Sequence, residues 1–198
     1  MLAGAVLALH CACGAALAAS SEAARVVETF HAKLIAVMQA AGALGFDGRM
    51  RELSPAVAAT FNFPLMARLS VGPEWQRFTP EQQQQFVDLF GKYSAATYAG
   101  RFDGFNGERF ETLGEKPQQG GSIVVETKLV MPTGEPVKLA YLAARNGAAW
   151  QIVDVFVNGT ISELAVRRSE YTAILRREGP SGLIATLTRK IDELQSKS

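Results

Sequence analysis

Residues 122–158 read SIVVETKLVMPTGEPVKLAYLAARNGAAWQIVDVFVN, and this stretch decides the fold. It contains three strand-length segments rich in Val, Ile and aromatic residues, at 122–131, 136–145 and 149–158. The turn sequences PTGE and Asn146-Gly147 separate these segments. Because Asn-Gly between two such segments is a strong signal for a hairpin, the pattern predicts three consecutive antiparallel strands.

A fourth strand is predicted directly before this stretch, at 108–117, with the turn sequence QQGG between them. Alternate residues of a strand share one face of a sheet. The residues expected on the inward face are almost all apolar: Ile123, Val125, Thr127, Leu129 and Met131, then Val137, Leu139, Tyr141 and Ala143, then Trp150, Ile152 and Phe156. Such a face is either ordinary core or the wall of a cavity for an apolar ligand.

Helical patterns precede the strands. Apolar residues recur with a helical period over 25–41, and a second helix is expected at 47–60. Asn62 followed by Pro64 predicts the N-cap of a short third helix. The sequence TPEQ at 79–82 predicts a capping box and a fourth helix that runs to about Gly100.

The helical period returns after the strands, from Ile161, and is interrupted once at Gly179-Pro180. The chain therefore predicts an α+β fold, in which helices cover one face of a curved four-stranded antiparallel sheet. The net charge of +1 over 198 residues provides no field for binding nucleic acid.

The N-terminus has the composition of an export signal. No charged residue precedes Ser20, and Ala16-Leu17-Ala18 matches the small-x-small pattern of a signal-peptidase site. We therefore expect a signal peptide at 1–18 and a mature domain at 22–198 in the periplasm, although the basic residues that usually begin such a leader are missing. The alternative, an uncleaved membrane anchor, is disfavoured because the apolar run is short and contains His10.

Few residues outside the leader are suited to catalysis. Both cysteines lie within the leader, at Cys11 and Cys13, and His31 is the only later histidine, so we expect no metal site and no cofactor. Asp154, in the fourth strand, is either a general base or a structural group that caps a helix or pairs with an Arg. The basic doublets of the last helices are either a solvated face or a docking face for an acidic partner or for lipid headgroups.

Several ordered blocks resemble one known family. They are FNFPLMAR at 61–68 with Gly72 and Trp75, TPEQ with Phe86, Phe90 and Tyr98, and WQIVDV at 150–155 with Gly159, Ser162, RSEY at 168–171 and Leu183-Ile184. Together they resemble the MlaC family, also called the toluene-tolerance family of periplasmic lipid-binding proteins. The sequence GTIS at 159–162, in place of the usual Gly-Val-Ser, looks more like the hopanoid-associated branch, HpnM.

The resemblance implies a core like that of NTF2 with a helical subdomain and a cone-shaped apolar cavity that takes up lipid tails. It also implies a non-enzymatic shuttle for a phospholipid or hopanoid between the outer membrane and an ABC-type transporter of the inner membrane. The lipid-binding residues we expect are Val125, Leu129, Leu139, Tyr141, Ile152 and Phe156 from the sheet and Met66, Leu69, Phe90, Tyr93, Ile161 and Leu164 from the helices.

Two alternatives to a carrier remain open at this point. One is an enzyme on the same scaffold with Asp154 as base, and the other is a ligand-free interaction module that docks through its basic C-terminal helices. For a carrier, we expect Leu139→Asp or Ile152→Arg to lower lipid occupancy while the fold stays intact.

Overall fold

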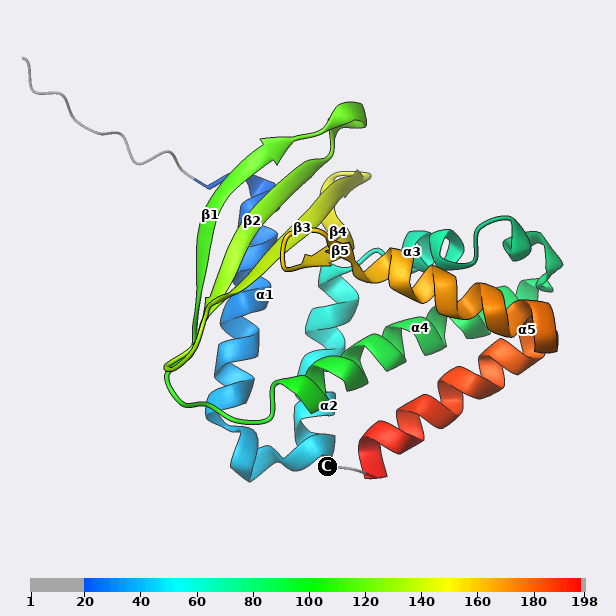
Figure 1. Ribbon diagram of the computed structural model, residues 1–198, viewed down its shortest axis with the longest axis horizontal. Helices are drawn as coiled ribbons and strands as arrows, with labels where there is room; N and C mark the ends of the chain where they lie inside the picture. Colours follow the sequence, from blue (N-terminus) through cyan, green and yellow to red (C-terminus); the bar gives the residue numbers. More distant parts are fainter. Residues whose placement is uncertain (1–19, 197–198) are drawn as a thin grey trace, which may run out of the picture.

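The computed structural model describes residues 20–196, and the expected signal peptide at 1–18 lies outside this range (Figure 1). The elements in chain order are α1 (Glu22–Gln39), α2 (Ala41–Thr60), α3 (Phe63–Val71), η1 (Gly72–Arg77), α4 (Pro80–Arg101), β1 (Arg109–Pro117), η2 (Gln119–Gly121), β2 (Ile123–Val130), β3 (Val137–Asn146), β4 (Ala149–Val157), β5 (Ile161–Ser162) and α5 (Glu163–Ser196). The predicted α+β class is confirmed.

The strands form one antiparallel sheet in the order β1-β2-β3-β4-β5. In Figure 1 the sheet curves over α1, while α3, α4 and α5 extend away from it to one side. The prediction of four strands was wrong by one, because Ile161 and Ser162 pair with the end of β4. Two residues are too few to produce an alternating pattern, so the sequence does not separate this strand from the following helix.

A bulge in β4 changes which residues face inward. Ala143 pairs with Ile152, but Leu142 pairs with Asp154, so Val153 is an extra residue without an opposite partner. One extra residue moves the later side chains of a strand to the other face. Val155 and Val157, opposite Tyr141 and Leu139, therefore face inward in place of Phe156, whose predicted inward position was wrong.

The predicted helix boundaries are confirmed where the sequence supplies caps. The Thr79 hydroxyl accepts a hydrogen bond from the Gln82 backbone N–H, and the Gln82 side chain accepts one from the Thr79 N–H. The Asn62 side chain accepts a bond from the Leu65 N–H. The expected interruption of the last helix is a kink in α5 at Gly179, where φ is +66° and glycine avoids the strain of a side chain.

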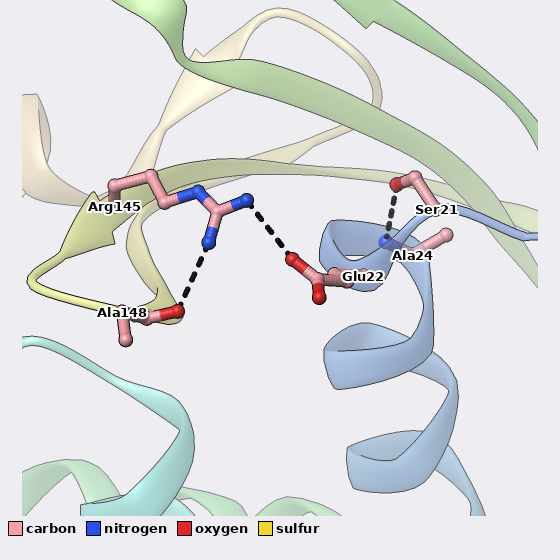
Figure 2. Close-up of polar contacts among 5 residues, drawn as sticks. All are labelled: Ser21, Glu22, Ala24, Arg145 and Ala148. Atoms are coloured by element: carbon pink, nitrogen blue, oxygen red, sulfur yellow. Dashed lines mark hydrogen bonds and ion pairs between the residues drawn. The ribbon is translucent and has the colours of Figure 1, made fainter.

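The start of α1 is fastened to the β3–β4 hairpin (Figure 2). Arg145 donates to the Glu22 carboxylate and to the Ala148 carbonyl, both at 2.9 Å. The Ser21 hydroxyl caps the helix by accepting a bond from the Ala24 N–H at 3.2 Å. An exposed ion pair of this kind contributes little stability, about 0–1 kcal/mol, so the buried face of α1 provides most of its attachment to the sheet.

The helices cover one half of the inward face of the curved sheet and leave the other half open. α1 packs across the sheet, and the inward side chains of Val125, Ala143 and Ile152 are completely buried. A backbone hydrogen bond also joins the helices to this half of the sheet, since the Asn62 N–H donates to the Ile152 carbonyl at 2.9 Å. Leu129 and Leu139, farther along the same inward face, are only partly buried. Within residues 20–196, no helix is both long and apolar enough to cross a bilayer.

Candidate ligand-binding cavity

A cavity of about 410 Å³ opens in the unfilled half, between the inward sheet face and the helices. Its wall includes the end of β2, the first half of β3 and the end of β4. The second half of α4, the loop that follows α4 and the first turns of α5 complete it. The lining residues are Met38, Phe61, Met66, Ser94, Thr97, Tyr98, Arg101, Phe102, Asp103, Gly104, Asn106, Glu108, Leu129, Met131, Val137, Leu139, Tyr141, Val155, Val157, Glu163, Leu164 and Arg167. The volume is within the range of about 300–1,000 Å³ that is usual for small-molecule pockets.

Five of the twelve expected lipid-binding residues line this cavity. They come from the sheet, from α3 and from α5, and they are Leu129, Leu139, Tyr141, Met66 and Leu164. Register explains the sheet residues, because Leu139 pairs with Val157 and Tyr141 with Val155 across the open half. Their role in binding lipid stays a prediction.

The other seven lie elsewhere. Phe90, Val125 and Ile152 are completely buried in the core, whereas Leu69 and Ile161 are about half exposed on the surface. Tyr93 borders a separate polar depression beside Arg49 and Leu194. Phe156 is turned away by the β4 bulge. Apolar periodicity identifies these residues as part of a buried pattern, but it does not separate core from cavity wall.

Aromatic residues that sequence reasoning did not assign to the cavity form its floor. The Tyr98 ring lies 5.0 Å from that of Phe30, edge-on, and 5.9 Å from those of Phe61 and Phe102. Burial raises the pKa of Tyr98. Phe61 and Tyr98 belong to the sequence blocks that resemble the family, and Tyr98 follows Phe90 by about two turns of α4.

His31 supports the cavity wall from behind. Its Nε2 atom and the Tyr141 hydroxyl lie 2.9 Å apart in a hydrogen bond that either group can donate, and its ring stacks on Phe110 at 3.8 Å. Burial lowers the pKa of His31 to about 3, so the ring is neutral at pH 7. A neutral, stacked imidazole bonded to a protonated Tyr is a structural arrangement that holds Tyr141 in place.

The His31 environment predicts an acid sensitivity. Between pH 6.5 and pH 3 the unfolded chain binds a proton on this residue that the folded protein does not, so the free energy of unfolding falls as pH falls. Between pH 7 and pH 4, the free energy of unfolding of the native protein should fall by about 3 kcal/mol more than that of a His31→Gln variant. Urea unfolding at both pH values measures this, and equal losses in the two proteins would contradict it.

Asp154 is a structural group. Its carboxylate accepts hydrogen bonds from the Val155 N–H at 2.8 Å, the Ser162 hydroxyl at 2.6 Å and the Leu164 N–H at 3.1 Å. The Ser162 hydroxyl in turn accepts from the Ala165 N–H, so the two side chains together cap α5. Asp154 is 8% exposed and does not line the cavity, which supports the capping interpretation over the general base.

Removing this cap should destabilise the fold. Asp154→Ala leaves the Leu164 N–H and the Ser162 hydroxyl without their acceptor, and we expect a loss of about 3 kcal/mol in the free energy of unfolding. Asp154→Asn keeps one acceptor oxygen and should lose less. Thermal or urea unfolding compares the two variants, and an alanine variant as stable as the native protein would refute the capping role.

The charged residues of the cavity lie at one side, where α4, the loop at 102–108 and α5 meet. They are Arg101, Asp103, Glu108, Glu163 and Arg167. Glu108 is engaged by the loop itself, because its carboxylate accepts from the Asn106 N–H at 2.6 Å, and such backbone bonds lower its pKa. Among residues 20–196 there is no group of three His, Cys, Asp or Glu side chains that could hold a metal ion.

Comparison with known proteins agrees with this fold. The model of the family described as "MlaC protein" matches residues 28–189. A solved structure of a phospholipid-binding protein from Ralstonia solanacearum, in complex with a phospholipid, matches with a TM-score of 0.77 and 21% identity, over 88% of this chain and 99% of that one. At this identity the match shows a shared fold. No curated protein matches this chain. Because the family model spans most of its length, the chain belongs to the MlaC family.

Proposed function

We propose that this protein is a non-enzymatic carrier that binds a phospholipid by its tails in the cavity between sheet and helices. The observation that carries the proposal is the open half of the sheet, where Leu129, Leu139, Val155 and Val157 face a hollow that the helices leave unfilled. A protein of the same fold is described in complex with a phospholipid, which supports the same class of ligand here.

The energetics suit a carrier. Each methylene transferred from water to an apolar environment gains about 0.8 kcal/mol, so two acyl chains with roughly 30 methylenes would cost on the order of 20 kcal/mol bare in water. A wall of Val, Leu and Met side chains offsets that cost. Asp154, the candidate general base, serves as a cap, and His31 is neutral and bonded to Tyr141.

The carrier would work in the periplasm, between an outer-membrane lipid complex and an ABC-type transporter of the inner membrane. Cleavage of the expected leader after Ala18 would leave α1 complete, because its cap is Ser21. A hopanoid is the alternative ligand, because the GTIS sequence resembles the hopanoid branch. An open cavity also favours a carrier over the ligand-free interaction module.

Lipid transfer between vesicles tests the shuttle. Donor vesicles that contain a self-quenched fluorescent phospholipid are mixed with unlabelled acceptor vesicles and the purified protein. We expect the rate of dequenching to rise in proportion to protein concentration. A rate equal to that of vesicles alone would contradict the proposal, and boiled protein controls for non-specific effects.

A further inference from the structure

Charges of both signs border the cavity without neutralising one another. Arg101, Asp103, Glu163 and Arg167 all line it, yet in the part of the chain that the structure describes none of them lies in an ion pair within 4 Å. Glu163 and Arg167 are four residues apart on α5, with the acid first, which is the favourable order for a helical ion pair. On the same helix Arg189 and Glu193, in the less favourable order, do pair at 2.8 Å.

Aromatic contacts explain why Arg167 stays apart from Glu163. Its guanidinium lies 4.8 Å from the centre of the Tyr93 ring and 5.1 Å from that of Phe90, and its Nη1 donates to the Tyr171 hydroxyl at 3.3 Å. These contacts hold the cation in a fixed position. A guanidinium has five N–H groups, so this arrangement leaves donors free to bind an anion.

The charges act on a common point in the cavity. Burial is the main cause that raises the pKa of Tyr98, the charges of Arg167 and Arg101 lower it, and the charge of Glu163 raises it. Arg101, Glu163 and Arg167 all line the same cavity as Tyr98. Glu108 also lines the cavity, but the Asn106 N–H already donates to its carboxylate.

We propose that this side of the cavity is a headgroup subsite for a zwitterionic phospholipid, with the phosphate between Arg101 and Arg167 and the ammonium group against Glu163. The proposal rests on the proposed function, since the tails provide most of the affinity. It narrows the substrate class to lipids that carry a phosphate and an amine together. Asp103, on the exposed loop, adds a second carboxylate for the amine.

Competition binding with three lipids of identical acyl chains tests the subsite. A fluorescent fatty acid is bound to the purified protein, and its displacement is measured with phosphatidylethanolamine, phosphatidylglycerol or diacylglycerol. We expect phosphatidylethanolamine to bind about fivefold more tightly than phosphatidylglycerol, as one partly exposed charge pair allows. Glu163→Gln should remove that difference. Arg101→Gln, at an exposed position where folding is unaffected, should bring phosphatidylethanolamine closer to diacylglycerol.

Controls separate the subsite from the carrier function. Arg176→Gln removes one exposed charge from α5 outside the cavity and should leave all three affinities unchanged. Equal binding of phosphatidylethanolamine and phosphatidylglycerol by the native protein, or a Glu163→Gln variant that keeps the preference, would overturn the subsite. Failure of all three lipids to displace the probe would instead overturn the proposed function. If free phosphoethanolamine displaced the fluorescent probe at the same concentration, the site would bind a soluble ligand and not a lipid headgroup. This result would also overturn the subsite.

Discussion

Leu139→Asp is expected to yield a folded protein that has lost at least about 100-fold in lipid affinity, because a carboxylate against acyl chains costs about 3 kcal/mol or more. Leu139 is only partly buried and lines the cavity, so the new charge can reach water when no lipid is present. In the lipid-bound protein that water is displaced by tails. The penalty therefore falls on binding and not on folding.

The matched control for this variant is Leu113→Asp. Leu113 is 54% exposed at the bulge of β1 and does not line the cavity, so the same substitution should leave lipid affinity unchanged. Lipid affinity by probe displacement and secondary structure by circular dichroism are measured for both proteins. A Leu139→Asp protein that binds lipid normally would show that the tails lie elsewhere.

Ile152→Arg is expected to unfold the protein, which revises the expectation drawn from sequence. Ile152 is completely buried, and its backbone pairs with Phe61 at the end of α2. A guanidinium at this position has no partner and no path to water, so the cost exceeds about 5 kcal/mol, comparable to the whole stability of a typical domain.

The conservative variant Ile152→Val provides the control, with an expected loss of about 1 kcal/mol. Solubility after expression and the urea midpoint distinguish the cases. An Ile152→Arg protein that folds normally but loses lipid would place this side chain in the cavity wall, against the structure.

Local signals in the sequence predicted most of the fold. The caps at Asn62 and Thr79 use side chains within three residues of the groups they bond, and the Asn146-Gly147 turn sets the β3–β4 hairpin by itself. Strand alternation likewise placed Leu129, Leu139 and Tyr141 on the inward face. Such features depend only on neighbours in the chain, so a single sequence reveals them.

The bulge and the extent of the cavity depend on contacts between distant segments. The extra residue Val153 moves Val155 and Val157 inward, and no turn residue marks it in an otherwise regular apolar run. Whether an inward residue is core or cavity wall depends on how far the helices reach across the sheet. Ile152 and Val157 look alike in the sequence, but Ile152 is completely buried where its carbonyl accepts from the Asn62 N–H, whereas Val157 lines the cavity.

Native mass spectrometry of the protein purified gently from its own cells, followed by extraction and identification of the bound molecule, tests the central claim most directly. The account predicts an added mass that equals one lipid, which is absent from the Leu139→Asp protein. A population that has the bare polypeptide mass in both proteins, under conditions that preserve other lipid complexes, would contradict it.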